Sequence, residues 1–202
     1  MPDDTVLEKA AAAKGPNASK KEETWWDVIK FALITLVIIV PVRLYIAQPF
    51  IVSGDSMFPT FHNGEYLVVD ELSYKFHPPV RGDVVIFKFP EDPSKYFIKR
   101  IIGLPGETVT IYGGKVYVKT SDGKQTAIAE PYLSQPTNKS TTTVLTKDQY
   151  FTMGDNRPVS YDSRYWGPVD IKHIRGRALL RLFPFNEISY LPGAFSDYKL
   201  AK

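Results

Sequence analysis

Hydrophobic positions first gather in one apolar segment, residues 25–46, whose central part, 31–42, is interrupted only by a threonine and a proline. A helix over these 22 residues would extend about 33 Å, close to the thickness of a bilayer's hydrocarbon core. Lys30 and Arg43 lie near its two ends and can reach the membrane surfaces. The pattern predicts a transmembrane anchor over 25–46, and a buried core helix is the alternative.

Charged residues around this segment predict its orientation. Four lysines precede it within residues 1–24, whereas after Arg43 the next basic residue is Lys75. Because positive charge favours the cytoplasmic side, the N-terminus is expected in the cytoplasm. Residues 1–24 are polar and contain a Gly-Pro-Asn break, so we interpret them as a flexible cytoplasmic tail. The remainder would then lie outside the cytoplasm.

From residue 47 the pattern changes to short apolar or alternating runs separated by glycine, proline and charge, which is typical of β-strands. Gly113-Gly114 between two alternating runs indicates a hairpin. The strands are expected at 66–69, 83–89, 96–102, 108–112, 115–119, 125–132, 150–153 and 175–183. Residues 134–146 are rich in Ser, Thr and Lys and suggest a solvated loop. We predict a mostly antiparallel β domain over 47–190 and a surface tail over 191–202.

Composition excludes several kinds of reactive or binding site. The chain has 202 residues, enough for one domain and an anchor, and its net charge of +3 gives no argument for binding nucleic acid. It contains no cysteine, which excludes disulfides, a thiol nucleophile and thiolate metal sites. Its three histidines are scattered without metal-ligand spacing. These observations give no sign of a metal site, and we expect no cofactor.

A short polar loop, Ser53 to Thr60, lies at the junction of the two patterns and contains Ser56. Gly54 permits backbone conformations that a side chain forbids, and Pro59 stiffens the exit. The loop is a candidate for carrying a serine nucleophile, and a turn at the start of a strand is the alternative interpretation.

Lys99 lies inside an apolar, β-branched run that is predicted to be a strand. If its amine is withdrawn from water, its pKa falls, and a neutral amine can take the proton of a serine hydroxyl. Ser-Lys pairs are an established variant of the serine nucleophile arrangement. Alternation alone also allows Lys99 to point to solvent.

Four stretches in this order resemble the type I signal peptidases, membrane-anchored serine proteases that remove signal peptides from exported proteins. The stretches are Ser53–Thr60, Arg81–Phe87, Tyr96–Glu107 and Gly154–Gly167. The resemblance implies a signal-peptidase-type β domain with a single N-terminal anchor. It implies cleavage after an Ala-X-Ala-like site through an acyl-enzyme, with Ser56 as nucleophile and Lys99 as general base.

The resemblance also assigns supporting roles. Ser160 matches a serine that hydrogen-bonds the catalytic lysine, and the backbone N–H of Ser56 would stabilise the oxyanion. Some family members have a serine hydroxyl where this chain has Gly54, so the second oxyanion donor is not identified. Arg100 is expected to pair with Asp155, and Arg164 with Asp162, as structural ion pairs. Paired carboxylates acting as acid and base are a weaker alternative.

Candidate substrate-binding residues are those expected near the nucleophile and in shallow subsites for small side chains. They are Phe50, Val52, Ser53, Gly54, Met57 and Phe97. Phe50, Val52 and Phe97 could equally be ordinary core. An apolar surface formed by Phe50, Met57, Phe58 and Phe61 either dips into the membrane interface or packs the first strand.

The expected partners are preproteins with signal peptides and the lipid bilayer, with no nucleic acid, and the chain is expected to be a monomer. It would be a single-pass protein of the cell membrane. Two rival functions remain. A catalytically silent homologue that binds preproteins is disfavoured by the presence of Ser56, Lys99 and Ser160. A Ser-Lys self-cleaving regulator would carry a DNA-binding module where this chain has a tail and an apolar segment.

Overall fold

The structure is a computed structural model that describes residues 25–41, 47–137 and 139–194. The chain divides into two compact units, Met1–Ile39 and Val40–Lys202. The predicted tail over 1–24 and most of the predicted tail over 191–202 lie outside the described residues.

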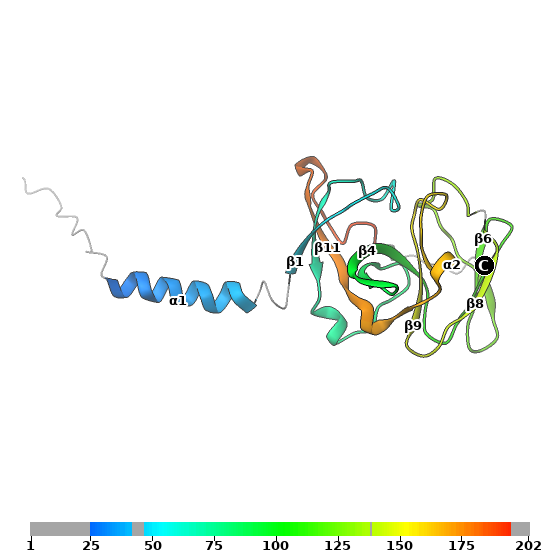
Figure 1. Ribbon diagram of the computed structural model, residues 1–202, viewed down its shortest axis with the longest axis horizontal. Coiled ribbons are helices and arrows are strands. Elements are labelled where there is room, and N and C mark those ends of the chain that lie inside the picture. Colours follow the sequence, from blue (N-terminus) through cyan, green and yellow to red (C-terminus); the bar gives the residue numbers. More distant parts are fainter. Residues whose placement is uncertain (1–24, 42–46, 138, 195–202) are drawn as a thin grey trace, which may run out of the picture. The chain divides into compact units, whose positions relative to one another are not determined.

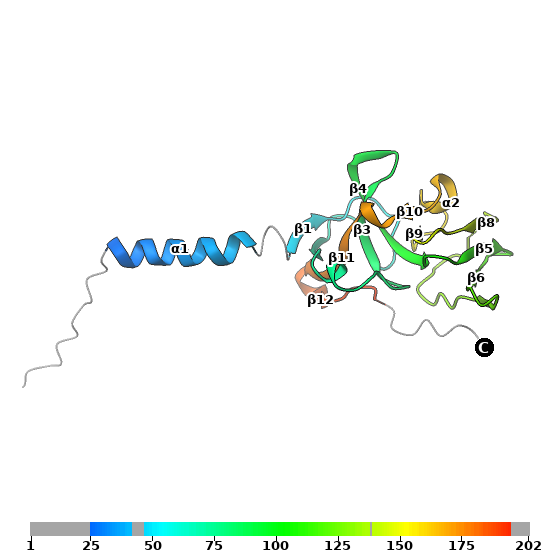
Figure 2. The same ribbon diagram turned by 90° about the horizontal axis from the view of Figure 1, so that it is seen from below.

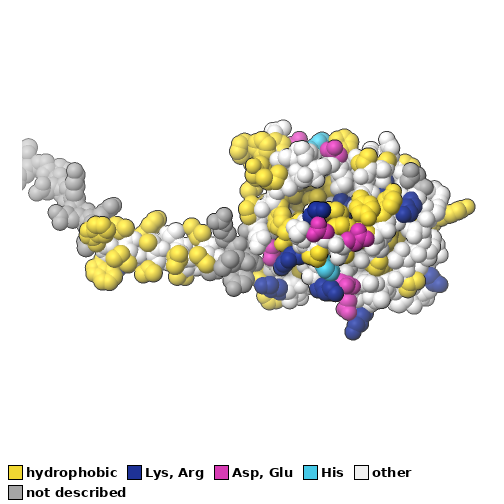
Figure 3. Space-filling model, viewed as in Figure 1, with side chains coloured by type: hydrophobic (Ala, Val, Ile, Leu, Met, Phe, Trp, Pro, Cys, Tyr) yellow, Lys and Arg dark blue, Asp and Glu magenta, His cyan; other side chains and the backbone are white. Residues whose placement is uncertain are grey.

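The first unit contains most of α1 (Trp25–Pro41), a 17-residue helix whose last two residues belong to the second unit. Nearly all its described side chains are exposed, and they are hydrophobic along the length of the face shown in Figure 3. At 1.5 Å per residue the helix is about 25 Å long. In the part of the chain that the structure describes, no helix combines the length and apolarity needed to cross a membrane. Residues 42–46 of the predicted anchor lie outside that part, and the anchor stays a prediction.

The second unit is built from antiparallel strands, as predicted (Figures 1 and 2). Its larger sheet has the order β1-β2-β11-β3-β4-β9-β10, with β12 added to β11. The strands of this sheet are β1 (Ala47–Ile51), β2 (Tyr66–Asp70), β3 (Val84–Phe89), β4 (Asp92–Gly103), β9 (Gln149–Met153), β10 (Val169–Asp170), β11 (Ile174–Phe183) and β12 (Ser189–Tyr190). The late strand β11 therefore lies between two early ones, β2 and β3.

A smaller sheet follows β4 in the chain and has the order β7-β6-β5-β8. Its strands are β5 (Thr108–Tyr112), β6 (Lys115–Lys119), β7 (Gln125–Ala127) and β8 (Thr141–Val144). The hairpin predicted at Gly113-Gly114 is confirmed, because Tyr112 pairs with Lys115 across it. In both ribbon views this sheet lies beyond β9, at the far end of the unit from β1.

Two predictions in this part were wrong in detail. The segment 134–146 was expected to be a loop, but its end forms strand β8, which pairs with β5 from Thr108↔Val144 to Ile111↔Thr141. All its residues are exposed or half-exposed, so this edge strand of threonines shows no apolar pattern. The strand expected over 125–132 ends at Ala127. The sequence pattern also missed α2 (Ser163–Trp166), a single turn capped by the Asp162 carboxylate.

Apolar side chains form three buried clusters in this unit. One lies under β1, β2, β3 and β11 and includes Val52, Met57, Phe61 and Leu67. Another joins the smaller sheet to the larger one, because Val109 and Val118 pack with Phe151 and Met153 of β9. Burying a side chain of this size contributes roughly 1.5–3 kcal/mol. This packing holds the strands that carry the candidate site residues.

Candidate active site

Strand β4 presents two consecutive cations, Lys99 and Arg100, to opposite faces of the sheet, because side chains alternate along a strand. Lys99 pairs with Val85 of β3, and Arg100 pairs with Val84 and, on the other side, with Met153. Lys99 is only 4% exposed and Arg100 is fully buried. The alternative in which Lys99 points to solvent is therefore wrong.

The loop between β1 and β2 carries Ser56. Gly54 lies there at φ +86°, a conformation that suits glycine, and its N–H donates to Asn63 Oδ1 at 2.9 Å. The N–H of Val52 donates to the Glu65 carbonyl at 2.9 Å and ties the two ends of the loop together. These contacts fix a tight polar loop next to β4.

Lys99 and Ser56 meet although they are 43 positions apart in sequence. The Nζ atom of Lys99 lies 2.8 Å from Ser56 Oγ, and it also donates to the Ile98 carbonyl at 3.0 Å. Nucleophile and base within such a distance are the geometric requirement for activating a hydroxyl. The ring of Phe97 lies beside the amine, with its centroid 5.2 Å away.

Burial lowers the pKa of the Lys99 amine to about 8, because the charged form loses its hydration. The negative charges of Asp162 and Asp155 oppose this fall, and the positive charge of Arg164 adds to it. At neutral pH an appreciable fraction of the amine is therefore neutral. Such an amine can accept a proton from the adjacent hydroxyl.

The structure places Ser160 differently from its expected contact with Lys99. Its Oγ atom is buried and has no hydrogen-bond partner among the described residues. It lies instead against Gly154, where an added methyl group would overlap both Ser160 Oγ and the Ser56 carbonyl oxygen. Ser160 is thus close to the nucleophile loop, but the lysine is oriented by Ser56 and Ile98.

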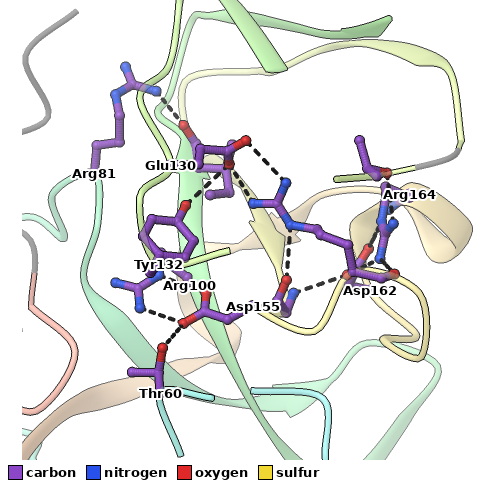
Figure 4. A network of polar contacts seen from close by, with 12 residues as sticks. Thr60, Arg81, Arg100, Glu130, Tyr132, Asp155, Asp162 and Arg164 are labelled. Atoms are coloured by element: carbon purple, nitrogen blue, oxygen red, sulfur yellow. Dashed lines mark hydrogen bonds and ion pairs between the residues drawn. The ribbon is translucent and has the colours of Figure 1, made fainter. Parts of the chain in front are cut away.

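On the other face of β4, Arg100 and Asp155 form the expected ion pair (Figure 4). The Arg100 Nε and Nη2 atoms donate to the two carboxylate oxygens at 2.8 and 2.5 Å, in a bidentate arrangement. Asp155 also accepts from Thr60 Oγ1 at 2.5 Å. Since Thr60 lies in the same β1–β2 loop as Ser56, this pair braces the nucleophile loop from behind.

The second expected ion pair, Arg164 with Asp162, is present as well (Figure 4). The Arg164 Nε atom lies 2.7 Å from Asp162 Oδ1, and both side chains are fully buried. Asp162 also accepts the Gly154 N–H at 3.0 Å. The pair therefore supports the same segment that contacts Ser56. Among the described residues neither carboxylate hydrogen-bonds Ser56 or Lys99, as an acid-base pair would require.

A cleft of about 750 Å³ opens above Ser56 and Lys99. Its lining is largely apolar and comes from β1, β4, the nucleophile loop and the loop after β9. Of the residues predicted to bind substrate, the lining includes Phe50, Val52, Ser53, Gly54 and Phe97. An apolar cleft beside a candidate nucleophile suits an extended, uncharged segment of a polypeptide.

Met57 was predicted to form a wall of this pocket, and the structure does not support that. Its side chain is buried in the core with Phe61, and it is absent from the described lining. Both residues are also too buried to contact a membrane. Of the proposed membrane-contact group, Phe58 is exposed and Phe50 is half-buried against Tyr96.

Several residues at the site were not predicted. Asn156 lines the cleft, and its N–H donates to the Ser56 carbonyl at 3.0 Å. Tyr96 and Tyr161 line the cleft from β4 and from the loop after β9. Asn156 and Tyr161 lie within a stretch that the sequence analysis singled out, but only contacts across the fold distinguish them from their neighbours.

A hydroxyl beside a buried amine at the floor of an apolar cleft, within an antiparallel β domain, defines the class: a serine hydrolase. The particular family is shown by comparison with known proteins. Residues 25–183 match the model of the family described as "Signal peptidase, peptidase S26", and the chain belongs to this family of serine endopeptidases.

Several curated proteins are similar over most of their length. "Probable signal peptidase I-1" of Synechocystis sp. is 39% identical over 183 residues, which cover 85% of this chain and 90% of the relative. "Signal peptidase I" of Leptolyngbya laminosa is 35% identical, with coverage of 85% and 86%. "Signal peptidase I" of Bacillus licheniformis is 34% identical, with coverage of 85% and 95%.

Proposed function

We propose that this protein removes N-terminal signal peptides from exported preproteins, with Ser56 as nucleophile and Lys99 as general base. The observation that carries the proposal is the 2.8 Å contact between Ser56 Oγ and a buried lysine amine. Membership in the signal peptidase family supplies the substrate class. The chemistry then follows from the side chains present.

In the proposed reaction, the neutral Lys99 amine takes the Ser56 proton as Oγ attacks the scissile carbonyl. The backbone N–H of Ser56 stabilises the resulting oxyanion, and Gly54 contributes no side-chain donor. The ammonium of Lys99 then protonates the leaving amine, which yields an acyl-enzyme and a released mature protein. Lys99 next deprotonates a water molecule that hydrolyses the ester and restores Ser56. Each step uses the side chains and backbone of the site, with water as the second substrate.

We propose that the cleft binds an extended segment with small side chains at the first and third positions before the cut. Phe50, Val52 and Phe97 would line the two shallow subsites, with Ser53 and Gly54 along the segment's backbone. Such subsites would give an Ala-X-Ala preference, because larger side chains would meet the apolar floor.

We further propose that the enzyme works at the cell membrane, with residues 25–46 as a single anchor and the β unit on the extracytoplasmic side. The apolar run and the lysines before it support this assignment. Preproteins carry apolar signal segments, so holding enzyme and substrate at one surface raises their effective concentration.

The test is cleavage of a preprotein with an Ala-X-Ala site by the detergent-solubilised full chain. Wild type should cut at that site, and Ser56→Ala and Lys99→Ala should not. The matched controls are Ser121→Ala and Lys115→Ala, which alter exposed positions in the turn after β6 and at the start of β6. Full activity in Lys99→Ala would exclude the Ser-Lys pair. Inactivity of the folded wild type would favour the silent preprotein-binding homologue instead.

A further inference from the structure

Glu130 and Tyr132 follow β7 in the chain and lie outside the cleft, on the side of β4 that carries Arg100 (Figure 4). Glu130 contacts a further buried arginine, Arg157, and Tyr132 contacts Arg100. Neither belongs to the described lining of the cleft. The sequence pattern predicts only a strand for these two residues. Through these contacts, the chain that follows β7 reaches the residues that hold Ser56 in place.

The support of Ser56 is the short segment Gly154–Asn156 that follows β9. The N–H of Asn156 donates to the Ser56 carbonyl and its Nδ2 atom to the Asp55 carbonyl, both at 3.0 Å. Gly154 packs so closely that a methyl group there would overlap the Ser56 carbonyl oxygen. Any displacement of this segment therefore moves the nucleophile relative to Lys99.

Arg157 holds this segment from the next position in the chain. Its side chain is fully buried, and its Nε atom donates to the Gly154 carbonyl at 3.0 Å. Its two terminal nitrogens both contact the carboxylate of Glu130, one of them at 3.2 Å. Glu130 thereby fixes the plane of the guanidinium and, through it, the Gly154 carbonyl.

Glu130 is also the counter-charge of Arg157. Burial opposes the positive charge of Arg157, but the hydrogen bond and charge of Glu130 outweigh it and raise the pKa of that guanidinium. Asp155 neutralises Arg100 in the same way. Removing Glu130 would leave a buried cation next to the Gly154 carbonyl without its carboxylate, which favours rearrangement of the segment.

Tyr132 links this arrangement to the second arginine. Its ring packs on the Arg100 guanidinium, with the centroid 4.1 Å from Cζ, and its hydroxyl donates to Glu130 Oε1 at 3.2 Å. Arg100 directly follows Lys99 in β4 and braces Asp155 of the supporting segment. Tyr132 thus contacts Glu130, which holds Arg157, and also Arg100, which holds Asp155.

We infer that Glu130 and Tyr132 are positioning residues for the peptidase reaction, which hold Gly154–Asn156 against Ser56 through Arg157 and Arg100. The inference rests on the proposed roles of Ser56 and Lys99. Because a displacement of about 1 Å at a reacting group can cost about 100-fold in rate, loss of these contacts lowers kcat. It changes KM much less, since Phe50, Val52 and Phe97, which line the proposed subsites, lie outside the displaced segment.

The experiment measures kcat and KM on the preprotein for the detergent-solubilised full chain, well below each variant's unfolding temperature. For Glu130→Ala we expect kcat to fall about 100-fold, and for Glu130→Gln about tenfold, with KM within about twofold. The amide keeps the shape but replaces one acceptor oxygen with a donor. Tyr132→Leu should lower kcat about tenfold, whereas Tyr132→Phe, which keeps the ring on Arg100, should lower it about twofold.

The matched control is Glu107→Gln. Glu107 is paired with Arg81 at 2.5 Å, and its side chain is 9% exposed against 7% for Glu130. Among the described residues its side-chain hydrogen bonds are to Arg81 and to the Leu104 N–H, and none is to residues 154–157. This variant should lose stability but keep kcat. If Glu130→Gln and Tyr132→Leu do the same, the inference is wrong.

A double-mutant cycle separates positioning from general weakening. In an Arg157→Lys background, which cannot be held bidentately, Glu130→Gln should lower kcat by less than threefold. An undiminished tenfold effect there would show that Glu130 acts by another route and would overturn the inference. Failure of the proposed function is recognised independently, because Ser56→Ala or Lys99→Ala would then retain activity whatever Glu130 does.

Discussion

Lys99 and Arg100 are consecutive residues of β4 and both are buried, but their positive charges are handled in opposite ways. Within the described residues Lys99 makes no ion pair, and burial lowers its pKa to about 8. Arg100 has a bidentate partner in Asp155. A buried cation without a contacting carboxylate becomes a candidate base, whereas one with a carboxylate becomes a brace for the loop around it.

The largest effect on this contrast is expected for Lys99→Met, which removes the amine and keeps a side chain of similar size. We expect kcat/KM to fall about 10⁴-fold, the scale seen when one member of a catalytic unit is removed. Stability at pH 7 should be unchanged or higher, because the folded state no longer buries an amine whose pKa it depresses. Urea unfolding and preprotein cleavage, with Lys115→Met as control, measure the two effects. A large loss of stability would contradict this contrast.

The Arg100–Asp155 pair, on the face of β4 opposite Lys99, is tested by Asp155→Asn. This change leaves the buried Arg100 guanidinium without its negative partner, so we expect the free energy of unfolding to fall by about 3–5 kcal/mol. Activity per folded molecule should fall as well, since Thr60 loses its carboxylate acceptor. Urea unfolding monitored by circular dichroism gives the first quantity. A change below about 1 kcal/mol would mean that the pair does not brace the fold.

The pH profile tests the charge state of Lys99. The neutral amine is the active form, so kcat/KM should rise about tenfold per pH unit below pH 8 and level off above it. The negative charge of Asp162 raises the pKa of Lys99. Asp162→Asn should therefore shift the midpoint to lower pH. A profile that is flat between pH 6 and 9, or a shift to higher pH, would contradict the assignment.

The smallest effect is expected at a solvent-exposed ion pair. Lys172 contacts Asp170 at 3.2 Å, but its side chain is 72% exposed. Lys172→Met should change the free energy of unfolding by less than about 0.5 kcal/mol, because water screens the pair. Comparing its urea midpoint with that of Asp155→Asn measures how much more a buried ion pair contributes to stability than an exposed one. An equal loss of unfolding free energy in the two variants would contradict the distinction between the buried Arg100–Asp155 pair and a surface pair.

Much of the fold could be predicted from sequence because most strands combine apolar patterning with glycine or proline at their ends. Strand β8 was missed since its threonines pair as an edge strand, with no alternation of apolar and polar residues. The direction of Met57 was also misjudged. A residue beside the nucleophile can point to the cleft or the core, and only the packing with Phe61 decides which.

The candidate site was predictable to a different degree. Ser56 and Lys99 stood out through residue type, neighbours and family resemblance, but their separation in sequence gives no distance between them. Ser160 was expected against Lys99, and the structure places it against Gly154. Glu130 and Arg157 could not be paired from sequence, because a contact across 27 positions leaves no local pattern.

The order of strands in the larger sheet has a consequence for biosynthesis. The nucleophile loop follows β1 and Lys99 lies on β4, but β2 and β3 are separated by β11, which ends at Phe183. The ribosome therefore has to synthesise β11 before the sheet that carries both reactive groups can assemble. We expect a polypeptide truncated before β11 to carry both groups without bringing them together, and therefore to be inactive.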